Sequence, residues 1–484
     1  MNRAISRVGF AVIVLMLILV GQLVYVQVID AKHLENNPLN RRAALRDINR
    51  PRGEIVTADG VVVAKSVRVH DSTEFKYQRS YPLGTLYQQV VGYQSFLLGS
   101  IGVERTYNDV LVGRDPELQI KSITKAFSQE STGTVVLSLR NDLQQAAANA
   151  LGDQRGSVVA INPKTGEILA MYSNPSYDPN PLTSHDTKAA TAYHQQLLAN
   201  PDKPDLARAY RERYAPGSSF KTITASVAIQ DGAATPDTNF PQRSELTLPQ
   251  TTSKLHNFGG ETCGGTLSNS FRESCNTTFG QLGLQLADSF VPGMEAFGIN
   301  SAPPIDIVPD PATSTGPAEG SFQENQPQFA FAGIGQGPVS VTPLQMALVA
   351  AGLANGGTIM QPHVVKAIRD SDGNLVRKID DKEWKTAVSP ATAQAVAAMM
   401  VTVVQSGTGT AAQISGVTVA GKTGTAQNDT GSPHAWFVAF APAEAPQIAI
   451  AVIVEHGGNA GSEATGGHVA APIARAVMRV ALGR

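Results

Sequence analysis

The start of this 484-residue chain limits its possible architectures more than any other segment. No charged residue stands between Val8 and Ile29, and a helix of about 22 residues spans roughly 33 Å, enough to cross a bilayer core of about 30 Å. The apolar residues run all round such a helix, which disfavours a core helix with one buried face. A cleaved signal peptide would need a small-x-small site after a shorter apolar run, and residues 22–27 offer none. We therefore expect one uncleaved membrane span.

Basic residues flank this span on both sides, so they do not orient it. Arg3 and Arg7 precede the span, and four further lysine and arginine residues follow it between positions 32 and 46. Long domains can also cross a membrane regardless of such charges. The side of the membrane on which the rest of the chain lies therefore stays open on this ground.

Composition excludes several other classes of protein. The chain has 38 basic and 40 acidic residues, and its net charge of -2 supplies no field that would attract nucleic acid. Two cysteines are too few for a disulfide scaffold or a four-cysteine zinc site. The nine histidines are scattered, without an HExxH pattern. We expect no metal, no cofactor and no nucleic-acid partner.

A strand-rich piece follows the span. Residues 30–50 are polar and typical of a linker. Two β-rich runs flank Asp59-Gly60, which indicates a hairpin, and a third run at 134–139 precedes a helical pattern at 143–151. We therefore place a linker and an amino-terminal pedestal domain at 30–151.

The remainder of the chain, 152–484, has the pattern of an α+β domain. Short apolar strands are expected at 157–161 and 168–173, and two more at 436–440 and 448–454. Alanine-rich helical stretches lie between these two pairs of strands. Helices inserted between the first and last strands of one sheet are typical of α+β folds.

Ser218 and Lys221 form the first pattern that carries chemistry. They open a helical run and lie three residues apart, on one face. A serine hydroxyl needs an adjacent base to become a nucleophile, and a desolvated lysine with a lowered pKa can supply it. The pattern alone is weak, because residues 122–125 match it too and are expected to be only a surface segment.

Two further patterns follow in order. Ser274 and Asn276 form the only Ser-x-Asn in the chain, and a Lys-Thr-Gly-Thr run comes later, at Lys422, Thr423, Gly424 and Thr425. The run follows an expected strand, so its lysine, hydroxyls and backbone N–H groups can bind a carboxylate and an oxyanion. A second Lys-Thr-Gly at 164–166 precedes the serine motif and is expected to be only a hairpin turn.

The ordered set SxxK, SxN and KTG is the signature of penicillin-binding proteins and class A β-lactamases. At these residues the chain resembles the class B penicillin-binding proteins, most closely the penicillin-binding protein A type of actinobacteria. Arg52-Gly53-Glu54-Ile55 is similar to the RGxI element of the family, although Thr57-Ala58 departs from it, and Gly102-Val103-Glu104 is similar to a second pedestal motif. The resemblance implies a penicillin-binding transpeptidase domain, serine β-lactamase-like, with an antiparallel sheet and helices.

The resemblance also implies an activity and a location. It implies a peptidoglycan D,D-transpeptidase outside the membrane, with residues 1–7 as a cytoplasmic tail. The implied partners are stem peptides, β-lactam antibiotics and a membrane glycosyltransferase of the shape, elongation, division and sporulation class. No glycosyltransferase domain is expected in this chain, because only about 120 residues separate the span from residue 152.

The resemblance gives each motif residue a role. Ser218 is the nucleophile and Lys221 its base, Ser274 relays a proton to the leaving amine, and Asn276 binds the substrate amide. Lys422 maintains the electrostatics of the site, Thr423 and Thr425 receive the terminal carboxylate, and Gly424 lets the strand approach the substrate.

Three other functions use the same motifs. A β-lactamase is disfavoured by the long pedestal and by the lack of a Glu-x-x-Leu-Asn run between Asn276 and Lys422. A D,D-carboxypeptidase stays open as an alternative, as does a non-catalytic scaffold or β-lactam sensor. The intact set of motif residues argues against the non-catalytic protein.

Cys263 and Cys275 are the only cysteines, and they lie in a segment expected outside the membrane, where disulfides persist. The glycines after Cys263 make a turn back toward Cys275 easy. We expect a disulfide, with two buried free thiols as the alternative. Trp436, near the KTG strand, is expected to be a core residue rather than a site residue.

Overall fold

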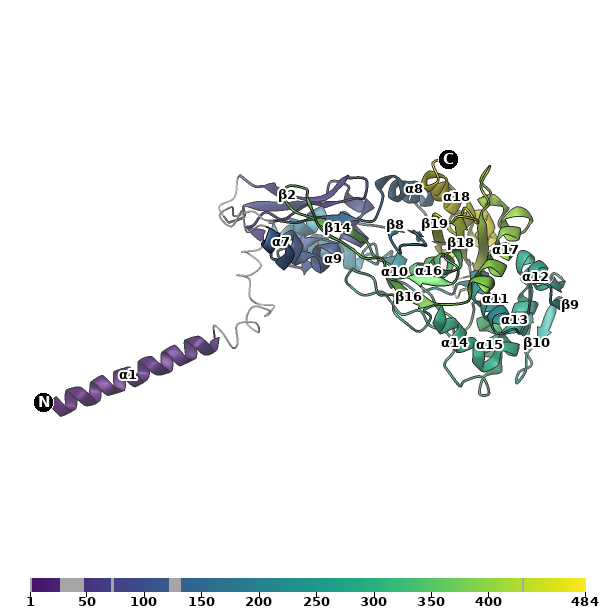
Figure 1. Ribbon diagram of the computed structural model, residues 1–484, viewed down its shortest axis with the longest axis horizontal. Helices are drawn as coiled ribbons and strands as arrows, with labels where there is room; N and C mark the ends of the chain where they lie inside the picture. Colours follow the sequence, from purple (N-terminus) through teal and green to yellow (C-terminus); the bar gives the residue numbers. More distant parts are fainter. Residues whose placement is uncertain (1, 27–47, 71–73, 122–131, 429–430) are drawn as a thin grey trace. The chain divides into compact units, whose positions relative to one another are not determined.

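The structure is a computed structural model that describes residues 2–26, 48–70, 74–121, 132–428 and 431–484 (Figure 1). The chain divides into two compact units, which comprise residues 1–51 with 67–78 and residues 52–66 with 79–484.

The first unit contains helix α1, Asn2–Val24. Its segment Ser6–Val24 has a mean hydropathy of 2.4 and is long and apolar enough to cross a membrane. The predicted span ran from Val8 to Ile29, and residues 27–29 lie outside the described residues. The helix begins before the predicted span, because the residues around Arg3 can continue a helix beyond the apolar segment.

A six-stranded sheet has the strand order β15-β14-β6-β1-β2-β3. Its strands are β1 (Ile55–Val56), β2 (Val62–Arg68), β3 (Tyr77–Ser80), β6 (Thr134–Leu137), β14 (Val365–Arg369) and β15 (Leu375–Lys378). The hairpin predicted at Asp59-Gly60 joins β1 to the antiparallel β2. Strand β6 lies between β1 and β14 in this sheet. Strand β14 comes from residues 152–484, which the sequence predicts to be the second domain. The sequence did not predict this pairing, because an open strand edge needs hydrogen-bonding partners but does not indicate where in the chain they lie.

A buried ion cluster joins the two pedestal motifs. Glu104 lies at the start of α5 (Val103–Thr106) and is fully buried. Its two carboxylate oxygens accept from Arg52 Nε and Arg79 Nε, each at 2.6 Å. Burial raises the pKa of Glu104, but the charges and hydrogen bonds of the two guanidinium groups outweigh it, so the pKa lies below its usual value. The carboxylate is therefore ionised and holds both motifs.

Replacing Glu104 with alanine is expected to destabilise the protein by about 3 to 5 kcal/mol, because it leaves two guanidinium groups buried without a counter-charge. Asp109→Ala is the matched control, since Asp109 pairs with Arg114 on the surface with 69% of its side chain exposed. That pair contributes about 1 kcal/mol or less. Chemical unfolding followed by circular dichroism measures both, and equal losses would contradict the assignment.

The second sheet has five strands in the order β17-β18-β19-β7-β8, and every neighbouring pair is antiparallel. The strands are β7 (Gly156–Ile161), β8 (Ile168–Asn174), β17 (Ala420–Ala426), β18 (His434–Ala441) and β19 (Ile448–Val454). Four of them coincide with the predicted apolar strands, and the predicted α+β class is confirmed.

Helices cover both faces of this sheet (Figure 1). Neighbouring residues of β7 point to opposite faces, so Val158 packs in one core and Val159 in the other. Helices α8 (Asn141–Leu151) and α18 (Ala471–Ala481) supply the first core, and α16 (Pro343–Ala354) supplies the second. The strands are therefore apolar on both sides, which explains their unbroken hydrophobic sequences.

A further group of helices contributes to the second core. They are α11 (Lys221–Gln230), α12 (Leu267–Glu273), α13 (Asn276–Leu286), α14 (Phe290–Ala296), α15 (Gln326–Gly333) and α17 (Pro390–Ser406). Helix α11 contacts α13, α14 and α17. All eight residues from Lys221 to Ala228 are buried. The start of this central helix is consequently enclosed by protein.

Candidate active site

Ser218 lies in a single 3-10 turn, Gly217–Phe220, which leads directly into α11. Ser218 is half-buried, whereas Lys221 is fully buried. The backbone N–H of Lys221 donates to the carbonyl of Ser218, so the two residues share one helical turn. Gly217 has a φ of +53°, and a Cβ atom there would lie 2.6 Å from the carbonyl oxygen of Thr425. A glycine is therefore required for the turn to lie against strand β17.

The amine of Lys221 binds the SxN motif. Nζ donates to Asn276 Oδ1 at 2.8 Å and to the backbone carbonyl of Ser274 at 2.7 Å, and it lies 3.3 Å from Ser274 Oγ. Ser274 ends α12 in the left-handed conformation, with φ +66°, and Asn276 begins α13. The turn between these helices therefore places both polar side chains beside one lysine.

Lys422 approaches the same hydroxyl from strand β17. Its Nζ donates to Ser274 Oγ at 2.9 Å and to the Thr423 carbonyl at 3.1 Å. Ser274 thus stands between two buried lysines, which are 201 positions apart in the sequence. The fold brings together side chains from all three motifs.

Burial changes the chemistry of both amines. Desolvation, together with the nearby charge of Lys422, holds the pKa of Lys221 well below its usual value. Desolvation lowers the pKa of Lys422 to about 7. An ammonium group without a counter-charge is costly in such a place, so burial favours the neutral amine of Lys221, which can accept a proton.

The lowered pKa of Lys422 predicts a pH-dependent stability. The unfolded chain binds more protons than the folded one between pH 7 and the ordinary lysine value of about 10.4, so stability rises with pH in this window, by up to about 1.4 kcal/mol per pH unit. Lys422→Met removes this contribution. We expect the variant to be more stable than the parent near pH 7 and the difference to shrink toward pH 10, as measured by chemical unfolding. Parallel pH dependences in the two proteins would contradict the lowered pKa.

Strand β17 lies close to the serine turn because it carries a glycine. A Cβ atom on Gly424 would lie 2.7 Å from the Pro216 carbonyl and 3.0 Å from the backbone nitrogen of Ser219. Thr423 Oγ1 shares a hydrogen bond of 2.5 Å with Thr408 Oγ1, and Thr425 is half-buried. The four residues of the run thus lie along the edge of the sheet that faces the turn.

No role in the site was predicted for several residues that shape it. Trp436 is fully buried, as predicted, but its indole Nε1 also donates to the Ala215 carbonyl at 3.0 Å. The carbonyl of Gly335 accepts from Gly217 N–H at 2.9 Å. A Cβ atom on Gly466 would lie 2.5 Å from the Gly424 carbonyl. The glycines around 335 and 466 were the available signal, because a glycine in a structured region often marks a close approach of two backbones.

The decoy Lys-Thr-Gly run is not in the site. Residues 164–166 lie in the turn between β7 and β8, where Gly166 has a φ of +82° and donates to the Asn162 carbonyl. The Ser-x-x-Lys match at 122–125 lies outside the described residues.

A disulfide links Cys263 to Cys275, with their Cα atoms 5.9 Å apart. Cys263 begins β12 (Cys263–Thr266), and Cys275 is the middle residue of the SxN motif. The bond thus closes a loop next to Ser274 and Asn276.

Thiol titration of the denatured, unreduced protein is expected to find no free thiol. A loop of this size stabilises a protein by about 3 kcal/mol in the chain-entropy model. Reduction is expected to slow acylation by a β-lactam as well, because the SxN turn loses its tether. Two free thiols per chain would refute the bond.

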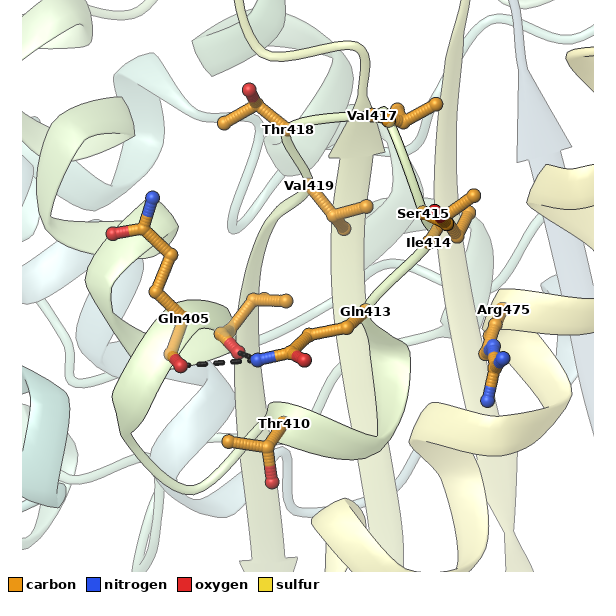
Figure 2. A pocket seen from close by; sticks show the side chains of 11 residues that line it. Gln405, Thr410, Gln413, Ile414, Ser415, Val417, Thr418, Val419 and Arg475 are labelled. Atoms are coloured by element: carbon orange, nitrogen blue, oxygen red, sulfur yellow. Dashed lines mark hydrogen bonds between the residues drawn. The ribbon is translucent and has the colours of Figure 1, made fainter.

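A cavity of about 640 Å³ lies outside this site (Figure 2). Its lining comes from the segment between the end of α17 and the start of β17, together with Arg475 of α18. Gln413 spans part of it and donates to the backbone carbonyl of Gln405. None of its lining residues belongs to the three motifs, so we do not assign it to the candidate site.

The chain is similar to known proteins over its whole length. Residues 156–479 match the penicillin binding protein transpeptidase domain, and residues 52–136 match the penicillin binding protein A dimerisation domain. The chain is 39% identical to "Peptidoglycan D,D-transpeptidase PbpA" of Mycolicibacterium smegmatis and 37% identical to that of Mycobacterium tuberculosis, and these alignments cover 100% of this chain and 99% of each relative.

A solved structure matches as well. The ceftriaxone acyl-enzyme complex of penicillin-binding protein A from M. tuberculosis superposes with a TM-score of 0.84 at 37% identity, covering 90% of this chain and 100% of the other. The motifs, both domain matches and the full-length relatives agree. The chain belongs to the class B penicillin-binding proteins.

Proposed function

We propose that this protein is a peptidoglycan D,D-transpeptidase that works through an acyl-enzyme on Ser218. The observation that carries the proposal is the amine of Lys221, which is buried, has a lowered pKa, binds Ser274 and Asn276, and shares a helical turn with Ser218. This is the arrangement that an activated serine requires.

In the first half-reaction, Ser218 Oγ attacks the carbonyl between the two terminal D-alanines of a stem peptide, and Lys221 takes the hydroxyl proton. The backbone N–H groups of Ser218 and Thr425 stabilise the oxyanion, a contribution of about 3 to 4 kcal/mol for each donor. Ser274 relays a proton to the departing amine. The peptide bond breaks, free D-alanine leaves, and the shortened stem peptide stays on Ser218 as an ester.

In the second half-reaction, the amine of a neighbouring stem peptide attacks this ester. The amine loses a proton to the site, the ester bond breaks, and the proton returns to Ser218 Oγ. Asn276 holds the amide of the donor stem peptide, while Thr423 and Thr425 receive the donor's terminal carboxylate beside Lys422 during the first half-reaction, before D-alanine leaves. A β-lactam imitates the donor and acylates Ser218, in line with the ceftriaxone acyl-enzyme of the M. tuberculosis protein.

A product assay separates this function from a D,D-carboxypeptidase. The full chain is incubated with a donor stem peptide that ends in D-alanyl-D-alanine, with and without a labelled acceptor amine. Released D-alanine together with a labelled cross-linked product supports a transpeptidase. Release of D-alanine with only hydrolysed donor would overturn the proposal in favour of the carboxypeptidase. A protein that binds β-lactam but releases nothing from the donor would favour the scaffold.

We infer that α1 is a single-pass anchor with its amino end in the cytoplasm, and that residues 30–151 and 152–484 act as pedestal and transpeptidase domains outside. The length and hydropathy of Ser6–Val24 support the anchor. The pedestal then offers a surface for a membrane glycosyltransferase of the shape, elongation, division and sporulation class. Co-purification of such an enzyme with the full chain, and its loss when the anchor and pedestal are exchanged, would test this partner.

A further inference from the structure

The four residues before Ser218 are each held by a different part of the fold. Backbone hydrogen bonds pair Tyr214 with Val341, at 2.9 and 2.8 Å. The carbonyl of Ala215 accepts from Trp436 of β18, and that of Pro216 packs against Gly424 of β17. Gly217 donates to Gly335. The position of the nucleophile is therefore set by contacts outside its own helix.

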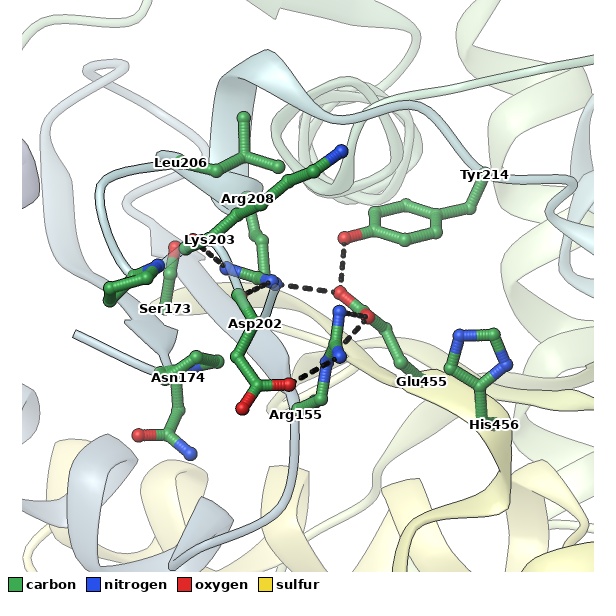
Figure 3. Close-up of polar contacts among 12 residues, drawn as sticks. Arg155, Ser173, Asn174, Asp202, Lys203, Leu206, Arg208, Tyr214, Glu455 and His456 are labelled. Carbon is green, nitrogen blue, oxygen red and sulfur yellow. Dashed lines mark hydrogen bonds and ion pairs between the residues drawn. The ribbon is translucent and has the colours of Figure 1, made fainter. Parts of the chain in front are cut away.

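The side chain of Tyr214 belongs to a buried ion cluster at the end of β19 (Figure 3). The hydroxyl of Tyr214 donates to Glu455 Oε1 at 2.7 Å, and Arg208 Nε donates to the same oxygen at 2.8 Å. The second oxygen of Glu455 accepts from Arg155 at 3.2 Å. Tyr214 and Glu455 are each 6% exposed and Arg208 is 1% exposed. Solvent therefore has little access to the bonds that Tyr214 and Arg208 make with Glu455.

The cluster is anchored on the protein backbone. The two other guanidinium nitrogens of Arg208 donate to backbone carbonyls: Nη1 to that of Lys203 at 2.9 Å and Nη2 to that of Asp202 at 2.6 Å. The backbone N–H of Glu455 donates to the Arg155 carbonyl at 2.8 Å. Burial raises the pKa of Glu455, but the Tyr214 hydrogen bond and the two guanidinium charges outweigh it and keep the carboxyl ionised. Glu455 is thus a fixed, charged acceptor for the Tyr214 hydroxyl.

The ring of Tyr214, whose hydroxyl is held by Glu455, packs against the neighbouring strand β18. It packs edge to face on Trp436, with ring centroids 6.1 Å apart, and on His434, at 5.4 Å. Trp436 in turn binds the next residue, Ala215. Rotation of Tyr214 would consequently shift both the indole and the segment that enters the serine turn.

We propose that Glu455, acting through the hydroxyl of Tyr214, is a positioning residue for the nucleophile Ser218. The inference rests on the proposed function, because it assumes that Ser218 is acylated. A reacting atom must be held within a fraction of an ångström of its productive position. The cluster supplies this constraint through the segment that enters the turn, whereas α11 is the segment that leaves it.

The test is the variant Tyr214→Phe in the full chain, which removes the hydroxyl and keeps the ring. We expect the rate constant for acylation by a β-lactam to fall about 10-fold, while the non-covalent affinity for the drug stays within about twofold of the parent. Stopped-flow measurement at several drug concentrations separates these two quantities. A merely structural role would not change the rate constant alone.

Two matched controls accompany this variant. Tyr87→Phe removes a hydrogen bond of 3.1 Å to Asn141, a residue outside the candidate site, and is expected to leave acylation unchanged. Asp202→Asn removes only the exposed ion pair between Asp202 and Arg155, and is also expected to leave acylation unchanged.

Glu455→Gln keeps an acceptor for the Tyr214 hydroxyl but removes the charge, and is expected to acylate at a rate between those of the parent and Tyr214→Phe.

The outcomes are distinct. Acylation of Tyr214→Phe at the parent rate would overturn the positioning role while leaving the proposed function intact. Equal slowing in Tyr214→Phe and Tyr87→Phe would also overturn it, because the effect would then follow stability. A parent protein that forms no adduct at Ser218 would overturn the proposed function and the positioning role together.

Discussion

A β-lactam is expected to add its mass once to the parent protein, on Ser218, and Ser218→Ala is expected to abolish the adduct. Ser218 is half-exposed at the start of α11 and shares a turn with a lysine whose pKa is lowered. Ser274 is half-buried as well, but its hydroxyl accepts hydrogen bonds from both buried lysines rather than donating to either of them. Intact-protein mass spectrometry followed by peptide mapping measures the result.

Two other serines provide the controls. Ser219→Ala is the matched variant, since the hydroxyl of Ser219 is fully buried and donates to the Pro216 carbonyl at 2.8 Å. It is expected to retain the adduct. Ser122→Ala tests the decoy Ser-x-x-Lys match and is also expected to retain it. Full labelling of Ser218→Ala, or an adduct mapped to Ser122, would refute the assignment of the nucleophile.

Lys221→Met is expected to slow acylation by about 10²- to 10⁴-fold, the range typical of losing a general base. The substitution removes the amine that binds Ser274 and Asn276 and leaves an apolar chain of similar length in the same buried space. Stability is expected to change little or to rise, since burial disfavours the charged form of this lysine. Acylation kinetics and thermal unfolding of the same samples separate the two effects.

The control for this variant is Lys164→Met, in the second Lys-Thr-Gly run. Lys164 lies exposed in a turn, so its loss is expected to change neither the acylation rate nor the unfolding temperature measurably. Acylation of Lys221→Met at the parent rate would exclude this lysine as the base.

Local sequence patterns were enough to predict much of this protein. Four strands of the catalytic sheet follow from short apolar runs, because a strand buried on both faces must be apolar at every position. The hairpin at Asp59-Gly60 follows from its turn residues. The order of the three motifs, rather than any one of them, separated Ser218 and Lys422 from their decoys.

Other features depend on the tertiary structure. The pairing of β6 with β14 joins residues more than 200 positions apart, and the sequence around either strand contains no signal for it. Glu455 has no motif around it, and its role depends on Tyr214 and Arg208 arriving from distant segments.

For Lys221 as well, one property can be predicted from the sequence and another depends on the tertiary structure. The spacing of Ser218 and Lys221 predicts that they lie on one face of a helix, whereas the lowered pKa of Lys221 depends on which side chains enclose it. Periodicity and turn residues are local and can be read along the chain. Burial, long-range hydrogen bonds and the electric field at an amine depend on the whole fold, since they are set by neighbours in space rather than in sequence.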